Sequence, residues 1–379
     1  MKGSDGTGRR RAFNILLTGD YLGESGRVEW GDIGLDVLDN EPNVKVGFLL
    51  DQKPDANDPT YWDRLYSLEV KPHHVAEANG LVVCRPWVRA SAFSSGAENL
   101  VVIGRAGAGY DKIDLEACTA NDVAVFYSPD TLSHSTASAA FLFMLALAMQ
   151  LPKQERLARS GRWDRQAKVK GKDLSGQTLG IVGMGNTGQE LARLVAPFKM
   201  RVLAYSPHAD PTRARALGVT MVPTMEELLC ESDFVSLHRR LLETTRGMMG
   251  EREFRMMKPT AYFINVARGE LVQQDVLIRC LQDRWIAGAG LDVFEEEPLP
   301  AGNPLIGLDN VILTPHYLPA THQATRATLA SILRGMLRIA DGNLPNNILN
   351  PEVLDRPGFH AKLASFGNGS RGTLVEPIA

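Results

Sequence analysis

The chain has 379 residues, which is more than one hydrophobic core usually serves, so two domains are expected. Its net charge of −3 and 44% hydrophobic content are those of an ordinary globular protein, and they exclude the strongly basic surface that nucleic-acid binding requires. The four cysteines have no paired spacing, which predicts free thiols, a cytoplasmic location and no metal site.

The first third of the chain predicts a small open α/β unit. Its apolar runs are short, rich in Val, Leu and Ile, and ended by Gly, Pro or Asp, as buried parallel strands are. Residues 51–61 contain two prolines and are expected to be a surface loop. The expected strands are 14–17, 44–50, 81–85, 101–106 and 123–127, and the expected helices include 33–40 and 115–121.

The segment 135–151 is apolar on every face of a helix. Its most apolar window, 139–151, is shorter than the roughly 20 residues that span a bilayer, so a buried helix is expected and no membrane partner. Because such a helix must be covered on all sides, we expect it between two domains or at the contact of a homodimer. Pro152 is expected to end this helix.

A second α/β run begins at Thr178. Six apolar strands alternate with helices, which predicts a doubly wound parallel sheet. A further helix is expected at 321–339, and the remainder is expected to be irregular because of its prolines. The expected strands are 179–182, 201–205, 234–237, 261–265, 287–292 and 311–314, and the expected helices include 188–197, 225–231 and 275–284.

Residues 183–188 form a Gly-x-Gly-x-x-Gly segment between an expected strand and an expected helix, which is the placement that dinucleotide binding requires. Gly183 permits the tight turn, Gly185 lets a pyrophosphate approach the backbone, and Gly188 lets helix and strand pack closely. The helix N-terminus offers N–H groups and a partial positive charge to the phosphates. NAD is therefore the expected cofactor.

The end of the next strand bears on the choice between NAD and NADP. An acidic residue is expected there, about 20 residues after the glycines, to hold the ribose hydroxyls. This chain has Ser206 instead, which removes the repulsion of a 2′-phosphate and leaves a small hydroxyl. Positive charge is available nearby on Arg213, Arg215 and a protonated His208, but no arginine directly follows Ser206. We therefore expect NAD to be used and NADP to be tolerated.

Polar side chains stand at the carboxyl ends of the later expected strands, which converge on one crevice in a doubly wound sheet. Reduction of a 2-keto acid needs an acid with a pKa near neutrality and a cation for the carboxylate. A histidine beside a glutamate supplies the first, and an arginine supplies the second. The candidates are His238, Arg268, Asp292, Glu297 and His316.

Five segments, in order and in rough spacing, resemble the signatures of the D-isomer-specific 2-hydroxyacid dehydrogenase family: 105–111, 183–188, 263–269, 288–298 and 313–316. The resemblance covers about residues 80–350. It implies an α/β fold with two doubly wound parallel-sheet domains, in which a Rossmann-type cofactor domain is inserted into a flavodoxin-like substrate domain. The expected boundaries are 1–128 and 319–379 for the substrate domain and 129–318 for the dinucleotide-binding domain.

The resemblance also implies a catalytic role for three residues. Arg268 would hold the substrate carboxylate and polarise the carbonyl, since its planar fork matches a carboxylate. His316 would give a proton to the carbonyl oxygen in reduction and take it in oxidation. Glu297 would pair with His316, stabilise the imidazolium and raise its pKa.

Binding roles follow from the same resemblance. Asp292 would hold the nicotinamide carboxamide, and the backbone N–H groups of Ala108 and Gly109 would cradle the substrate carboxylate. Arg85 is either a further substrate contact or a core-edge arginine, and His238 has a structural or cofactor-edge role more than a catalytic one. The other positions expected at the cofactor are Asn186, Thr187, Ser206, Val266, Ala267, Arg268 and His316.

Two departures from the family pattern concern the substrate. Tyr127 begins Tyr-Ser-Pro-Asp where the family usually has Asn-x-Pro-Gly, and Ser138 lies in Ala-Ser-Ala where it usually has Ala-Glu-His. The first departure lies on the expected hinge between the domains, near the substrate, and is compatible with a specialised substrate; whether either departure alters the substrate is left open by the sequence. Glu297 disfavours a formate dehydrogenase relative, which has glutamine there. The alternative from another class is an NAD-sensing scaffold or co-repressor that keeps the same residues without turnover.

Overall fold

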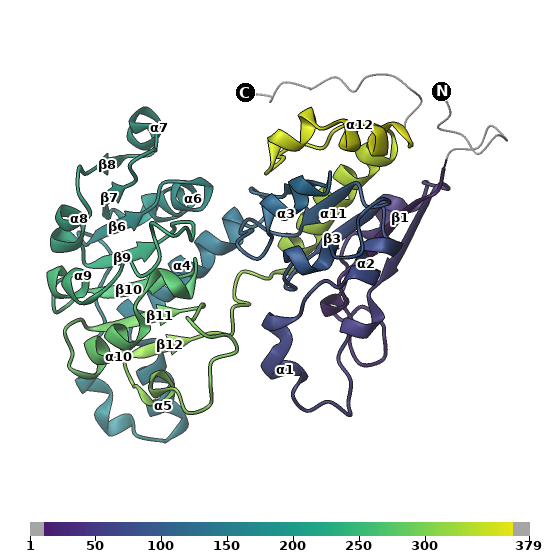
Figure 1. The fold of residues 1–379 in the computed structure, drawn as a ribbon. Helices are drawn as coiled ribbons and strands as arrows, with labels where there is room; N and C mark the ends of the chain where they lie inside the picture. The colour runs from purple at the N-terminus through teal and green to yellow at the C-terminus, as the bar shows by residue number, and fades with distance from the viewer. Residues whose placement is uncertain (1–10, 367–379) are drawn as a thin grey trace. The chain divides into compact units, whose positions relative to one another are not determined.

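The computed structural model describes residues 11–366, which form two compact α/β units (Figure 1). The first unit combines Met1–Leu132 with His322–Ala379, and the second unit is Ser133–Thr321. The chain therefore leaves the first unit, completes the second, and then returns to the first.

The first unit is built on a five-stranded sheet in the order β2-β1-β3-β4-β5, and every neighbouring pair is parallel. This is the strand order of flavodoxin-like sheets, so the expected fold class of this unit is confirmed. The strands are β1 (Phe13–Leu17), β2 (Val44–Phe48), β3 (Gly80–Val83), β4 (Val102–Arg105) and β5 (Ala124–Tyr127).

Helices cover this sheet on both faces, with a separate apolar core on each. On one face, Leu333 and Met336 of α11 pack in the same core as Val82 of β3. On the other face, Val75 of α2 packs in the same core as Leu81. Neighbouring residues of a strand point to opposite faces, so Leu81 and Val82 each fill one core. The helices of this unit are α1 (Tyr61–Arg64), α2 (Pro72–Glu77), α3 (Leu115–Ala120), α11 (His322–Ala340) and α12 (Pro357–Ala364).

The second unit has a seven-stranded parallel sheet in the order β12-β11-β10-β9-β6-β7-β8, which Figure 1 shows. This is the Rossmann strand order with one strand added at the β12 edge, and it confirms the expected Rossmann-type fold. The strands are β6 (Thr178–Val182), β7 (Arg201–Tyr205), β8 (Val219–Met221), β9 (Phe234–Leu237), β10 (Tyr262–Asn265), β11 (Gly288–Leu291) and β12 (Val311–Leu313).

Helices also cover both faces of the second sheet (Figure 1). Leu277 of α10 packs in the same core as Val235 on one face, and Leu191 of α6 packs in the same core as Ile181 on the other. The helices of this unit are α4 (Ser133–Ala148), α5 (Leu151–Arg159), α6 (Asn186–Val195), α7 (Pro211–Ala216), α8 (Met225–Glu231), α9 (Glu251–Met256) and α10 (Gln274–Gln282).

The helix expected at 135–151 differs from the helix observed. α4 ends at Ala148, Gln150 has a left-handed φ of 54°, and α5 begins at Leu151. Pro152 therefore lies in the first turn of α5, where its missing N–H costs no hydrogen bond, and it does not end α4 as expected. No single helix among residues 11–366 is long and apolar enough to cross a bilayer; α4 and α5 reach that length only together, across a bend of 61°.

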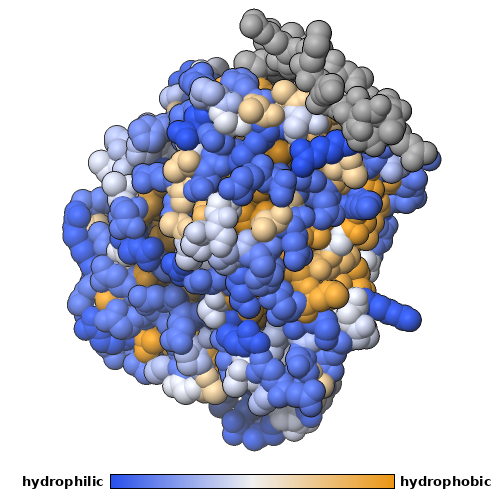
Figure 2. Space-filling model, turned by 45° about the vertical axis from the view of Figure 1, so that its right-hand side comes forward, coloured by the Kyte–Doolittle hydropathy of each residue, from blue (hydrophilic) through white to orange (hydrophobic). Residues whose placement is uncertain are grey.

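One side of the segment formed by α4 and the start of α5 is covered by its own unit, and the other side is not. Phe143 and Met144 are buried in the core beneath α4. Leu142, Met149 and Leu151 are 48%, 47% and 53% exposed, respectively. Figure 2 shows that apolar areas interrupt a mainly hydrophilic surface. The second unit by itself therefore leaves an apolar side of this segment open to solvent.

Two expectations about the first unit are wrong. The helix expected at 33–40 is only a 3₁₀ turn at Leu35–Leu38, because Gly34 before it has a left-handed φ of 79°. The segment after 339 is not irregular, since it contains α12, whose Phe359 is fully buried in the core. A buried aromatic residue gives this short helix the tertiary packing that its own sequence cannot supply.

Two smaller differences concern short elements. The expected loop 51–61 overlaps a 3₁₀ turn at Leu50–Gln52 and ends on the first residue of α1. The second sheet has a seventh strand, β8, where six were expected. This strand has three residues, which is too short for its composition to stand out from the surrounding loop.

Candidate active site

The glycine loop joins β6 to α6, and each of its glycines meets a different steric requirement. Gly183 has a φ of 109°, and a Cβ at this position would lie 2.6 Å from the carbonyl oxygen of His238. A Cβ on Gly188 would lie 2.2 Å from the carbonyl oxygen of Gly183, so only glycine lets α6 approach β6 this closely. Apart from Gly185 itself and its two chain neighbours, no heavy atom of the described residues lies within 4 Å of the Cβ position of Gly185, which leaves room for a ligand.

The N-terminus of α6 faces this open space. Gly185 is its N-cap and supplies no side-chain cap, and the next two residues, Asn186 and Thr187, are exposed and partly exposed. The first N–H groups of a helix have no carbonyl partner within the helix and carry a partial positive charge. Together with the glycine cradle, this end of α6 fits the pyrophosphate of a dinucleotide.

Ser206 and His238 directly follow the two strands that flank β6, which are β7 and β9. Ser206 directly follows β7 and is partly buried. The ring of His238 forms a 2.8 Å hydrogen bond between Nε2 and the hydroxyl of Ser236. Burial lowers the pKa of His238 to about 4, so its ring is neutral at pH 7. A neutral ring bonded within its own strand supports a structural or cofactor-edge position for His238.

The loop after β10 is shaped by Asn265, the last residue of that strand. Its Nδ2 donates to the carbonyl oxygen of Arg268 at 2.9 Å, and its Oδ1 accepts from the N–H of Ala267 at 3.0 Å. These bonds hold Val266, Ala267 and Arg268 in a tight turn, and Arg268 Nη1 donates to the carbonyl oxygen of Ala267 at 2.9 Å. Asn265 was not among the sequence candidates, although a lone polar residue ending a buried strand is a usable signal.

Asp292 follows β11 and is only 1% exposed. Its Oδ1 accepts the hydroxyl of Thr314 at 2.6 Å and the N–H groups of Tyr317 and Leu318 at 3.2 Å each. Its Oδ2 is buried and has no hydrogen-bond partner within residues 11–366. Burial raises the pKa of Asp292 by more than these hydrogen bonds lower it. A buried acceptor that lacks a donor fits the amide of a nicotinamide carboxamide.

His316 and Glu297 form a direct pair. Nδ1 of His316 lies 2.7 Å from one carboxylate oxygen of Glu297, and the N–H of Phe294 donates to the other at 3.0 Å. Burial acts to raise the pKa of Glu297, but the hydrogen bond to His316 and its charge outweigh burial, so the pKa is lowered and the group is ionised. An ionised carboxylate can only accept a hydrogen bond, so the Nδ1 atom of His316 carries the proton in this pair.

The backbone of His316 is also unusual. Its φ of 51° lies in the left-handed region, which is uncommon for residues other than glycine. Such conformations cost free energy and persist where the surrounding structure holds them, often at functional sites. The N–H groups of the next two residues, Tyr317 and Leu318, both bond Asp292, which holds this turn in place.

The expected carboxylate cradle belongs to the first unit, in the loop after β4. Ala108 is exposed, Gly109 is partly exposed, and neither N–H has a hydrogen-bond acceptor in the part of the chain that the structure describes. Arg105 shapes this loop, because its Nε donates to the carbonyl oxygen of Gly109 at 2.6 Å and its Nη1 donates to that of Ala106. The sequence placed Arg105 in a family motif but did not assign it this function.

Arg85 also belongs to the first unit, in the loop after β3. Its backbone N–H donates to Oδ2 of Asp20 at 3.1 Å, and its Nη1 lies 3.5 Å from the same oxygen. Its guanidinium lies 4.6 Å from the ring centre of Trp30 and 5.6 Å from that of Tyr66. Because Asp20 is buried, these contacts favour the core-edge alternative for Arg85 over a substrate contact. Asp20 was not identified from the sequence.

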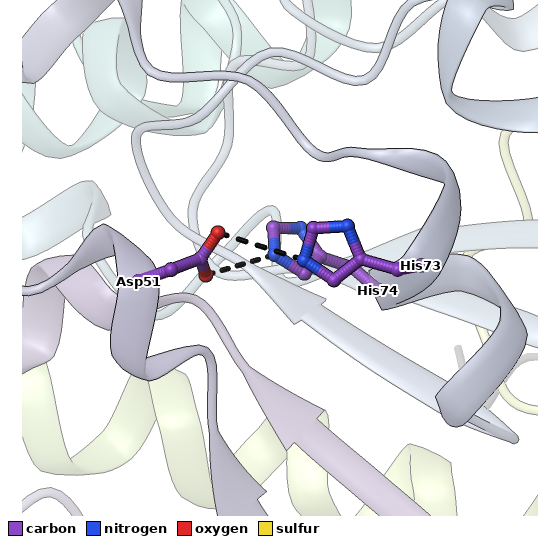
Figure 3. A group of neighbouring side chains, drawn as sticks. All are labelled: Asp51, His73 and His74. Carbon is purple, nitrogen blue, oxygen red and sulfur yellow. Dashed lines mark hydrogen bonds and ion pairs between the residues drawn. The ribbon is translucent and has the colours of Figure 1, made fainter.

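A second polar cluster of the first unit lies between α2 and the 3₁₀ turn at Leu50–Gln52 (Figure 3). His74 Nε2 lies 2.9 Å and His73 Nε2 lies 3.6 Å from the carboxylate of Asp51, and the three ligand atoms are within 4.8 Å of one another. The backbone N–H of Lys71 donates to His74 Nδ1 at 3.0 Å, so the Nε2 of a neutral ring carries the proton and donates to Asp51. The Nζ of Lys71 is 3.3 Å from the same carboxylate. This arrangement caps α2.

The sequence matches the family to which the motifs point. Residues 141–317 match the D-isomer specific 2-hydroxyacid dehydrogenase, NAD binding domain. Over 268 residues the chain is 40% identical to the glyoxylate reductase of Korarchaeum cryptofilum, covering 69% of this chain and 80% of that protein. The chain belongs to the D-isomer-specific 2-hydroxyacid dehydrogenase family. As a D-2-hydroxyacid dehydrogenase, it is an oxidoreductase that transfers a hydride between a nicotinamide cofactor and a small 2-keto or 2-hydroxy acid.

Other members extend this similarity. The dehydrogenase is 39% identical over 254 residues to the D-3-phosphoglycerate dehydrogenase of Methanocaldococcus jannaschii, covering 67% of this chain and 48% of that protein. The crystal structure of the TT0316 protein from Thermus thermophilus superposes with a TM-score of 0.73 at 30% identity, over 89% of this chain and 100% of that one.

Proposed function

We propose that His316 is the acid and base of the reaction in this dehydrogenase. The observation that carries the proposal is the 2.7 Å contact between His316 Nδ1 and the ionised carboxylate of Glu297. The carboxylate orients the ring, and its negative charge stabilises the positive charge of the protonated ring. The Nε2 atom of His316 then gives a proton to the carbonyl oxygen of the 2-keto acid in reduction and takes it back in oxidation.

Arg268 binds the carboxylate of the substrate in this proposal and polarises the carbonyl beside it. A guanidinium offers two parallel N–H donors, which match the two oxygens of a carboxylate. The turn that Asn265 holds at the end of β10 fixes the backbone from which this side chain extends. Arg268 and Glu297 are also close enough that the arginine charge lowers the pKa of the glutamate.

The two units take different parts in this proposal. The second unit, Ser133–Thr321, binds the dinucleotide and carries Arg268 and His316, and the first unit offers further donors for the substrate carboxylate. The N–H groups of Ala108 and Gly109, which have no acceptor within residues 11–366, are donors of the kind that a carboxylate requires. Arg85 stays a weaker candidate because its contacts to Asp20 and two aromatic rings already fix it.

The cofactor is held by the glycine loop and by Asp292 in this proposal. When bound, the reduced nicotinamide supplies the hydride. The carboxamide of the nicotinamide would donate to the buried Oδ2 of Asp292. The pyrophosphate of the dinucleotide would bind at the N-terminus of α6, beside Gly185. The adenosine end would lie beside Ser206 and His238. Ser206 brings no negative charge, so NAD is used and NADP is tolerated.

The substrate is a small 2-keto acid, and glyoxylate is the first candidate because several relatives are glyoxylate reductases. We propose that the enzyme acts in the cytoplasm as a homodimer. All four cysteines lie among the described residues and are unpaired, which suits a reducing compartment. The exposed apolar side of the segment formed by α4 and the start of α5 is the surface that a second copy would cover.

The test is a steady-state assay of NADH and NADPH oxidation with a panel of 2-keto acids, followed by chiral analysis of the product. The expected result is turnover with a small 2-keto acid and a D-2-hydroxy acid as product. Turnover should be lost in His316→Asn and kept in Glu296→Gln, a matched control at an exposed neighbour of Glu297. NADH binding without turnover on any 2-keto acid would instead support the scaffold or co-repressor alternative.

A further inference from the structure

Two consecutive arginines follow β9, directly beside the glycine loop. The N–H of Gly183 donates to the carbonyl oxygen of Tyr205 at 2.9 Å, on the β7 side of the loop. On the β9 side, the Cβ position of Gly183 lies 3.1 Å from the backbone nitrogen of Arg239. Gly183 therefore lies between Ser206, which follows β7, and the pair Arg239 and Arg240, which follows β9.

Both arginines lie at the surface of the second unit. Arg239 is partly exposed and Arg240 is exposed. Arg239 forms no ion pair with any residue in the described part of the chain. The carbonyl oxygen of Arg240 accepts the hydroxyl of Thr245 at 2.8 Å, which fixes the turn that carries both side chains.

Two acidic residues of the neighbouring helices, Glu190 of α6 and Asp210 at the start of α7, already have partners. Glu190 of α6 pairs with Arg193 at 3.0 Å and with His134 at 2.8 Å. Asp210 accepts from the N–H of Thr212 at 2.8 Å as the N-cap of α7. Ser206 supplies no carboxylate at the end of β7. This edge of the sheet therefore carries two cationic side chains, a serine hydroxyl and the positive end of α6, with one exposed carboxylate, Glu243, in the turn after Arg240.

We propose that Arg239 and Arg240, with the Ser206 hydroxyl, bind the 2′-phosphate of NADP(H). The adenosine ribose of a dinucleotide lies at the end of the second Rossmann strand, here β7, and a nearby arginine accommodates its 2′-phosphate. Adjacent strands are about 4.8 Å apart, so β9 is roughly 10 Å from β7, a span that an extended arginine side chain largely covers. The arginines come from the strand beyond the glycine loop and not from the loop that carries Ser206. The proposal rests on the proposed nicotinamide site.

The test compares the binding of NADPH and NADH to the full chain by calorimetry, without any 2-keto acid. In the double variant Arg239→Gln with Arg240→Gln, the dissociation constant for NADPH should rise about 10- to 100-fold, the effect of losing charged hydrogen bonds. The constant for NADH should change less than about twofold. Arg246→Gln is the matched control, because Arg246 is an exposed arginine a few residues further along the same turn, and it should change neither constant.

Two further measurements separate charge from general damage. 2′,5′-ADP should bind the wild type more tightly than 5′-AMP does, and the double variant should lose that difference. Added salt should weaken NADPH binding more than NADH binding in the wild type, but equally in the double variant, because salt screens exposed charges. Ser206→Asp should also weaken NADPH binding selectively, through like-charge repulsion.

The outcomes distinguish this proposal from the function on which it rests. If the wild type binds NADH and NADPH but the double variant loses both equally, or neither, the arginines are not the 2′-phosphate site and the dehydrogenase assignment is untouched. If the wild type binds NADH and rejects both NADPH and 2′,5′-ADP, the subsite does not exist. If it binds no nicotinamide dinucleotide at all, the proposed cofactor site itself is wrong.

Discussion

The carboxylate of Asp292 accepts the hydroxyl of Thr314 at 2.6 Å through one oxygen, while its other oxygen is buried without a partner in the described part of the chain. An unsatisfied buried acceptor costs free energy unless a ligand completes it. The structure therefore contains the acceptor of a hydrogen bond, and the nicotinamide amide can supply the donor.

Replacing Asp292 by Asn should weaken NADH binding about tenfold, because an amide donor would meet the carboxamide donor where an acceptor stood. The unfolding free energy should change little or rise, since an unpartnered buried carboxylate is removed. Thr314→Val is the comparison, because it removes a partner of Oδ1 and leaves Oδ2 unchanged. Calorimetric titration with NADH and urea unfolding measure the two effects. Equal NADH affinity in Asp292→Asn and wild type would show that Oδ2 has another purpose.

His316→Asn should reduce turnover by about 10² to 10⁴, which is the usual contribution of a positioned general acid. Glu297→Gln should reduce turnover less and leave the KM for NADH near its wild-type value, because the ring loses its orienting carboxylate and keeps its nitrogen atoms. The double variant should be no worse than His316→Asn alone, since the two residues act as one unit. Additive losses in the double variant would contradict the 2.7 Å pair as a functional unit.

Arg268→Ala should lower kcat/KM for the best 2-keto acid about 10- to 100-fold, the range for a lost charged hydrogen bond, and more if the bond strengthens in the transition state. Arg268→Lys should recover little, because an ammonium cannot form the two parallel bonds of a guanidinium. NADH affinity, measured separately, should stay within about twofold. An unchanged kcat/KM in Arg268→Ala would remove this residue from the substrate site.

The second unit should lose stability as the pH falls from about 6.5 to about 4, because His238 is neutral when folded. Its pKa is about 4 in the folded state against 6.5 when unfolded, so over this interval protons bind the unfolded state more than the folded one. The shift corresponds to at most about 3 kcal/mol, present above pH 6.5 and lost as the pH falls. Urea unfolding of wild type and His238→Gln at pH 7 and pH 4.5 tests this. The variant should show a smaller pH dependence, and an identical one would refute the assignment.

Leu142→Asp combined with Met149→Asp should convert the proposed dimer into a monomer, because charges would replace two side chains that are about half exposed on the apolar segment. Sedimentation equilibrium at micromolar concentration gives the molecular mass. Trp62→Asp is the control, since Trp62 is 59% exposed on α1 of the first unit and lies outside this segment. A wild-type protein that sediments as a monomer would end the proposal.

The sequence predicted the two sheets well because their strands are buried on both faces. Strands such as β6 and β9 are mostly apolar, and every residue of both strands is buried. The expected helix at 33–40 failed for the opposite reason. Its apolar spacing suits a helix, but Gly34 takes a left-handed conformation and the segment forms only a 3₁₀ turn. Local patterns cannot show where the tertiary structure requires a turn.

The candidate site could be predicted as positions but not as contacts. Arg268, Glu297 and His316 stand out as polar residues after apolar strands. The partners that hold them do not, because those contacts arise only after folding. Asn265 acts through the loop after β10, and Thr314 reaches Asp292 across 22 residues of sequence. No spacing in the chain indicates that, among residues 11–366, one oxygen of Asp292 has three donors and the other has none.

Because the second unit is inserted within the first, the two units are completed in a fixed order during translation. A ribosome completes all five strands of the first sheet before it makes α11, which supplies Leu333 and Met336 to one face of that sheet. Until then Phe13 and Val82 lack the side chains that cover them. The second unit, Ser133–Thr321, is continuous and has its sheet and both helical layers before the chain returns. One apolar face of the nascent first sheet therefore stays uncovered until α11 is translated, which happens only after the entire second unit.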